Sequence, residues 1–114
     1  MQLAERAVGD VIVLAPCGRM TRNEAFGVVK HRLHDLVQEG RRKLVLDLAG
    51  VSYMDSTCIG ELVSGLLTVR KNGGTLLLAS PTPRIERLLT IAGLTSVFQT
   101  FRSEQEAVLS LRER

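Results

Sequence analysis

The hydrophobic residues of this chain fall into short continuous runs and into stripes with helical spacing. Residues 3–16 predict a hairpin, because the apolar run Val11 to Ala15 follows the turn pair Gly9-Asp10. Residues 21–38 have apolar positions three and four apart, which predicts one helix that ends at Gly40. The stripe of this helix consists of Phe26, Val29, Leu33, Leu36 and Val37.

Two further apolar runs flank a second helical stripe. Residues 43–48 and 75–80 are nearly continuous in apolar residues, which is typical of strands buried on both faces. Between them, a helix is predicted to begin at Asp55-Ser56, after an apolar strand, and to end near Asn72-Gly73-Gly74. Its stripe consists of Ile59, Leu62, Val63, Leu66 and Leu67.

The last part of the chain carries local signals for two more helices. Thr82 followed by Pro83 is typical of a helix start, and Ser103 with Glu106 predicts a capping box that opens a final helix through Leu111. Residues 96–101 predict a short edge strand between these helices. The first of the two helices is predicted to end before Gly93, with a stripe of Ile85, Leu88, Leu89 and Ala92.

The order β-β-α-β-α-β-α-β-α predicts an α/β fold: a mixed sheet flanked by about four helices, in one domain spanning residues 1–114. Helical crossovers make neighbouring strands parallel, and ligands of such sheets collect at the carboxyl ends of the strands. Ser56 lies directly beyond one strand end, so this junction is the first candidate site.

Composition narrows the function classes. Among 114 residues, 45% are hydrophobic but only 4% are aromatic, so we expect an aliphatic core. The net charge of +3 is scattered, and the dense basic run Arg41-Arg42-Lys43 lacks the stacking aromatics of a nucleic-acid surface. Cys17 and Cys58 lack zinc-ligand spacing, so we expect no metal site. We also expect no cofactor. We recognise neither a signal peptide nor a membrane-spanning run, and we expect a cytoplasmic protein with reduced thiols.

Three roles are open for Ser56: helix cap, nucleophile or modified switch. A cap at Ser56 or Asp55 is the plainest role, and a phosphate there would meet the unpaired N–H groups of the helix start. Catalysis is disfavoured, because His31 and His34 are predicted on the surface of the first helix and residues 54–58 lack the glycines of a hydrolase elbow. The helix start could also lower the pKa of the Cys58 thiol, which would make it redox-reactive.

Three motifs together resemble the STAS domain family, particularly the bacterial anti-anti-sigma factors, also called anti-sigma factor antagonists. They are "MDST-IG" at Met54–Gly60, "NGG-LLL" at Asn72–Leu78 and "IAGLTSVF" at Ile91–Phe98. The resemblance extends from Val11 to about Val108 and implies a sheet of four or five strands with a function in binding rather than catalysis. It also implies phosphorylation of Ser56, with Thr57 as the fallback site. The implied partners are an anti-sigma factor of the GHKL serine kinase type and a PP2C-type phosphatase.

Two positions depart from the family pattern. Cys58 replaces a glycine that is common after the phosphorylated serine, and Thr21 stands where an acidic residue is expected. Arg19 and Arg22 make the loop before the first helix basic instead. We expect the partner-binding surface to consist of Gly18, Arg19, Met20, Thr21, Arg22, Asp55, Ser56, Thr57, Cys58 and Ile59.

The resemblance leaves other functions open. STAS domains also serve as stressosome-like scaffolds and as cytoplasmic subunits of lipid or anion transport complexes. A nucleotide or small-molecule sensor is a further alternative, although Gly73-Gly74 lacks the pattern of a phosphate-binding loop.

Overall fold

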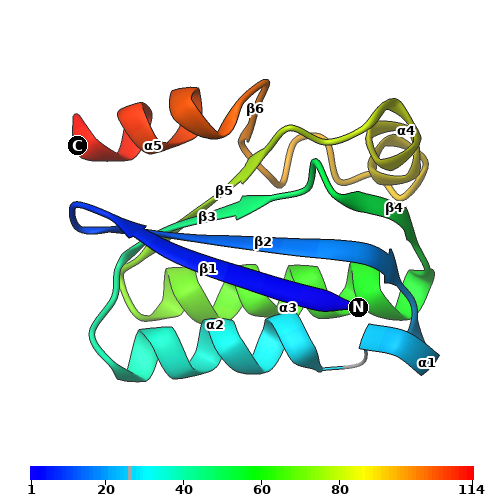
Figure 1. The fold of residues 1–114 in the computed structure, drawn as a ribbon, viewed down its shortest axis with the longest axis horizontal. Coiled ribbons are helices and arrows are strands. Elements are labelled where there is room, and N and C mark those ends of the chain that lie inside the picture. Colours follow the sequence, from blue (N-terminus) through cyan, green and yellow to red (C-terminus); the bar gives the residue numbers. More distant parts are fainter. Residues whose placement is uncertain (26) are drawn as a thin grey trace.

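The computed structural model describes residues 1–25 and 27–114, which form a mixed sheet with helices packed on both of its faces (Figure 1). In chain order the elements are β1 (Gln2–Val8), β2 (Val11–Met20), α1 (Arg22–Ala25), α2 (Val28–Gln38), β3 (Lys43–Asp47), β4 (Val51–Met54), α3 (Ser56–Lys71), β5 (Thr75–Ala79), α4 (Pro83–Ile91), β6 (Thr100–Phe101) and α5 (Glu104–Arg112). The predicted α/β class is confirmed.

The sheet has the strand order β1-β2-β3-β5-β6, with β4 paired to β2 off this path. β1 and β2 form the predicted antiparallel hairpin, and the other pairings are parallel. The helical crossovers between β2, β3 and β5 therefore bring the carboxyl ends of these strands to one edge of the molecule.

Side chains of β3 alternate between two separate hydrophobic cores. Leu44 and Leu46 join the core under α2 and α3, whereas Val45 joins the smaller core under α5. Figure 1 shows α2 and α3 on one side of the sheet and α5 on the other. The prediction that residues 43–48 form a central strand buried on both faces is confirmed for Lys43–Asp47, where the three middle residues are fully buried.

The single helix predicted over residues 21–38 is wrong, because the chain breaks into α1 and α2. Gly27 adopts a left-handed conformation with φ of 78°, which glycine tolerates without a steric cost. Both carboxylate oxygens of Glu61 on α3 accept the Gly27 N–H, at 3.1 and 2.9 Å. The helix break is thus held by a distant side chain. Four of the predicted stripe residues are buried, and the fifth, Phe26, lies outside the described residues.

The strand β4, which the sequence pattern did not separate from residues 43–48, lies between β3 and α3. A turn with a Val51 N–H to Leu48 carbonyl bond of 3.0 Å ends the β3 segment, and β4 then pairs with the last residues of β2. Gly50 permits this turn, since an added Cβ would lie 3.2 Å from the Pro16 carbonyl oxygen. Over residues 1–25 and 27–114 the sheet therefore has six strands instead of the expected four or five.

The later elements match their predictions with small corrections. Thr82 and Ser103 cap α4 and α5 as predicted, each accepting a bond from the backbone N–H three residues on, at 3.3 and 3.1 Å. The edge strand is shorter than residues 96–101, since only Thr100–Phe101 pair with β5. Two predicted stripe residues, Leu67 and Ala92, are exposed because they lie on the outer sides of their helices.

Candidate functional site

The two stretches predicted to bind a partner meet at one end of the molecule. Gly18, Arg19 and Met20 on β2 pair with Val51, Tyr53 and Met54 on β4, so the end of β2 lies beside the strand that leads into α3. Figure 1 shows the ends of β2 and β4, the short α1 and the start of α3 at the same edge. We call this region the Ser56 face, defined by Gly18, Arg19, Thr21, Arg22, Asp55, Ser56, Thr57 and Ile59.

Asp55 is the residue that holds this face together. Its Oδ1 accepts the Cys58 N–H at 2.9 Å and so caps α3, while its Oδ2 accepts the Arg22 N–H at 2.8 Å and so binds the start of α1. Its own N–H donates to the Met20 carbonyl at 3.1 Å. The N–H groups of Cys58 and then Arg22 stabilise the carboxylate and lower the pKa of Asp55.

Because Asp55 is the N-cap of α3, Ser56 lies one residue further on, inside the helix. Ser56 is the first residue of α3 and is exposed, and Thr57 after it is half-buried. The first turn of a helix has N–H groups without intrahelical partners and a partial positive charge. An oxyanion on Ser56 would therefore lie at a helix terminus that favours negative charge. Of the three roles considered for Ser56, that of helix cap is filled by its neighbour.

Two predicted surface residues lie beneath the surface instead. Met20 is 3% exposed and Cys58 is 1% exposed, and both belong to the main core. The apolar side of the α3 start faces the sheet, so the Cys58 side chain points inward from the helix. Both residues support the Ser56 face from below. They were predicted as part of the partner-binding surface, but they are not exposed on it.

The redox hypothesis for Cys58 is also contradicted. Burial, followed by the charge of Asp55, raises the pKa of the Cys58 thiol to about 12, so it stays protonated at neutral pH. The expected lowering by the helix terminus is outweighed because the sulfur lies in the core beside a carboxylate.

The remaining candidates lie at the surface. Arg19 and Arg22 are exposed, Gly18, Thr21 and Ile59 are half-buried, and Gly18 adopts φ of 110° at the point where β2 bends toward β4. Arg19 Nε lies 4.0 Å from a Glu24 oxygen on α1, a loose ion pair at the protein surface.

Tyr53 is a feature of the site that the sequence pattern did not indicate. The guanidinium carbon of Arg19 lies 5.3 Å from the centre of its ring, and that of Arg84 on α4 lies 5.8 Å away. The sequence signal that could have pointed to Tyr53 is its place as an aromatic residue two positions before Asp55. No sequence signal links Tyr53 to Arg84, since their contact depends on α4 packing against β4.

Metal, catalytic and membrane-spanning sites have less support in the described structure. Residues 1–25 and 27–114 contain no group of three His, Cys, Asp or Glu side chains placed to hold a metal ion. His31 and His34 are exposed on α2, as predicted, and neither forms a described hydrogen bond with Ser56. Two hollows, of about 340 and 410 Å³, are lined by residues outside the Ser56 face. No helix in the described part of the chain is long and apolar enough to cross a membrane.

Comparisons with known proteins agree with this architecture. A protein of Thermotoga neapolitana, named as the homologue of an anti-sigma factor antagonist, is 29% identical over 109 residues, which is 96% of each chain. The crystal structure of a Thermotoga maritima protein that is named as an anti-sigma factor antagonist matches with a TM-score of 0.88 at 27% identity, covering 96% of this chain and 94% of that one.

More distant structures share the fold. The Bacillus cell fate determinant SpoIIAA has been solved in unphosphorylated and phosphorylated forms, which match with TM-scores of 0.83 and 0.75 at 17% and 18% identity. They cover 99% of this chain, and this chain covers 98% and 100% of theirs. The family model described as the STAS domain matches residues 5–107, nearly the whole length. The chain therefore belongs to the STAS domain family.

Proposed function

We propose that this protein is an anti-sigma factor antagonist that binds an anti-sigma factor through the Ser56 face and is released by phosphorylation of Ser56. The observation that carries the proposal is the division of roles at the start of α3. Asp55 makes the capping bonds to Cys58 and Arg22, so the exposed Ser56 hydroxyl is not needed to hold the helix. A modification of Ser56 can therefore change the surface without removing a bond that the fold uses.

The physics of the switch follows from the position of Ser56. Phosphorylation transfers the terminal phosphoryl group of ATP to the serine oxygen and adds about −1.5 to −2 charges at neutral pH. The helix terminus stabilises this charge in the free protein, while the neighbouring Asp55 carboxylate opposes it. In a complex that excludes water from Ser56, the dianion would cost on the order of several kcal/mol.

The regulatory partners of this mechanism are a GHKL-type serine kinase, which is itself the anti-sigma factor, and a PP2C-type phosphatase that restores the serine. Thr57, half-buried in the same turn, is the second candidate for modification. The protein acts in the cytoplasm by binding and needs no cofactor. Support comes from the names of its full-length relatives and from the two phosphorylation forms of SpoIIAA, which has the same fold.

Affinity capture from a lysate of the native organism tests the proposal. Wild-type protein, Ser56→Asp and the control Ser96→Asp serve as baits, since Ser96 is an exposed serine outside the Ser56 face. We expect mass spectrometry to identify an anti-sigma factor kinase with the wild type and with Ser96→Asp, but not with Ser56→Asp. Phosphosite mapping of the native protein then decides between Ser56 and Thr57.

Two results would count against partner switching. Equal recovery of the kinase by all three baits would leave Ser56 without a role in binding. Recovery of transport or scaffold components in place of an anti-sigma factor would favour the alternative function, a STAS subunit of a larger complex.

A further inference from the structure

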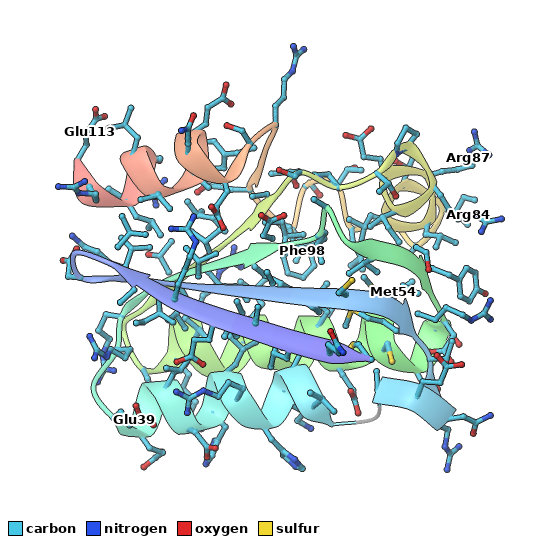
Figure 2. All side chains as sticks on the ribbon, in the orientation of Figure 1. Glu39, Met54, Arg84, Arg87, Phe98 and Glu113 are labelled. Atoms are coloured by element: carbon cyan, nitrogen blue, oxygen red, sulfur yellow. The ribbon has the colours of Figure 1, made fainter. Side chains whose placement is uncertain are left out.

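The Ser56 face continues into a group of three arginines, two of which contact the Tyr53 ring. Arg19 reaches the Tyr53 ring from β2 and Arg84 reaches it from α4, with guanidinium carbons 5.3 and 5.8 Å from the ring centre. Arg87 lies three residues after Arg84, one helical turn along the same side of α4. Figure 2 shows Arg84 and Arg87 projecting from α4 away from the sheet. We call Arg19, Tyr53, Arg84 and Arg87 the arginine–tyrosine patch.

The positive charge of this patch is poorly compensated within the protein. Among the described residues, Arg84 and Arg87 have no carboxylate within ion-pair distance, and Arg19 has only Glu24 at 4.0 Å. Glu86, the acidic residue between them in sequence, lines the hollow between α4 and β6 with Leu89 and Thr90, on another side of the helix. The patch thus has three exposed arginines, and the guanidinium groups of two of them, Arg19 and Arg84, lie over the Tyr53 ring.

This arrangement has the properties of a recognition site for carboxylates. A guanidinium group over an aromatic ring is held by a cation–π attraction and loses less freedom when it binds. Its N–H groups remain available at the edge for paired hydrogen bonds to a carboxylate. Arginine and tyrosine are also the residue types that most often dominate the energy of protein interfaces.

We propose that the arginine–tyrosine patch binds an aspartate- or glutamate-rich segment of the protein partner, next to the region that Ser56 controls. The identity of that partner rests on the function proposed above. The patch lies beside the Ser56 face because Tyr53 is on β4, which leads directly into Asp55, and Arg19 pairs with Tyr53 in the sheet. A partner that covers Ser56 can therefore reach the patch without leaving this edge of the molecule.

NMR titration of the ¹⁵N-labelled protein with a hexaglutamate peptide tests the proposal without the native partner. We expect the largest shifts at the Tyr53 amide and at the side-chain Nε–H signals of Arg19, Arg84 and Arg87. The double variant Arg84→Glu/Arg87→Glu should weaken binding by roughly tenfold or more. The control Arg41→Glu/Lys71→Glu makes the same charge change at exposed positions before β3 and β5, the opposite ends of the strands, and should bind as the wild type does.

Variants of Tyr53 separate the ring from its hydroxyl group. Tyr53→Phe keeps the ring under the guanidinium groups and should retain binding, whereas Tyr53→Leu should lose it. The circular dichroism of each variant confirms that it is folded. If Tyr53→Leu binds hexaglutamate as well as Tyr53→Phe, the ring does not organise the arginines and the proposal is wrong.

Three further results would overturn the proposal. They are equal shifts at all arginines, equal binding of a short single-stranded DNA at the patch, and the absence of any shift. The double variant is also used as a bait in the capture experiment. If it retains the anti-sigma factor as the wild type does, the patch lies outside the interface, although the function proposed for Ser56 stands.

Discussion

At the scale of single residues, the site depends on two neighbours with separate tasks. Asp55 is structural, because its two carboxylate oxygens accept N–H groups at the starts of α3 and α1. Ser56 is exposed and lies where a phosphate is electrostatically favourable. The sequence predicted the junction, since an apolar run met a polar pair and a helical stripe. It left the cap open between Ser56 and Asp55, and it could not show the second bond of Asp55, which goes to Arg22 on a distant segment.

Asp55→Ala should lower the free energy of unfolding by about 1–2 kcal/mol, because α3 loses its cap and the Arg22 N–H loses its acceptor. Ser56→Ala should change it by less than about 0.5 kcal/mol. Urea denaturation of both variants checks this difference. A loss at Ser56→Ala as large as that at Asp55→Ala would mean that Ser56 caps the helix after all.

The lowered pKa of Asp55 makes the stability of the protein depend on pH. The folded state holds the carboxylate more tightly ionised than the unfolded state does, through the Cys58 and Arg22 N–H groups. This contribution is complete above the pKa of the unfolded chain and is lost as the pH falls below about 4. Asp55→Asn should therefore lose less stability than the wild type between neutral and acidic pH in denaturation curves. Parallel plots of stability against pH for the two proteins would contradict the claim that the Asp55 carboxylate causes this pH dependence.

The two cysteines should differ strongly in reactivity. Cys17 is exposed, whereas Cys58 is buried with a thiol pKa of about 12. We expect a thiol reagent at neutral pH to label Cys17 quickly and Cys58 only after unfolding, as read by mass spectrometry. Cys17→Ser should abolish the fast phase, and rapid labelling that persists in this variant would place Cys58 at the surface.

At the scale of elements, helix starts that depend on local signals were predicted from the sequence, whereas features that depend on distant contacts were not. The starts of α4 and α5 were predicted because their caps lie three residues from the N–H groups that they accept. The break between α1 and α2 was not predicted, because it depends on Glu61 of α3. β4 was not separated from the strand at residues 43–48 for the same kind of reason, since its own register is set by pairing with β2.

Glycines on α3 provide a test of how α2 and α3 pack. An added Cβ at Gly65 would lie 2.7 Å from Cδ1 of the fully buried Leu33, whereas Gly60 has nothing within 4 Å. Gly65→Ala should destabilise the protein by about 1–3 kcal/mol, and Gly60→Ala should stabilise it by about 0.5–1 kcal/mol through helix propensity. Thermal unfolding of both variants measures the two effects. Equal changes of the same sign would show that α2 and α3 are not closely packed at Gly65.

At the scale of the whole molecule, the sheet brings the distant segments of the candidate site to one edge. The crossover connections predicted an α/β sheet with its site at the strand ends, and the fold confirms that class. The arginine–tyrosine patch could not be predicted, because Arg19, Tyr53 and Arg84 come from three elements that meet only in the folded chain. The same topology leaves the smaller core under α5 on the other face of the sheet.

The most direct test of the account compares the affinity of the captured anti-sigma factor for two forms of this protein, unmodified and phosphorylated at Ser56 by incorporation of phosphoserine during synthesis. Isothermal titration calorimetry should give an affinity at least about a hundredfold lower for the phosphorylated form, equivalent to roughly 3 kcal/mol. Urea denaturation should give nearly the same stability for both forms. Equal affinities of the two folded forms would contradict the claim that Ser56 is the switch.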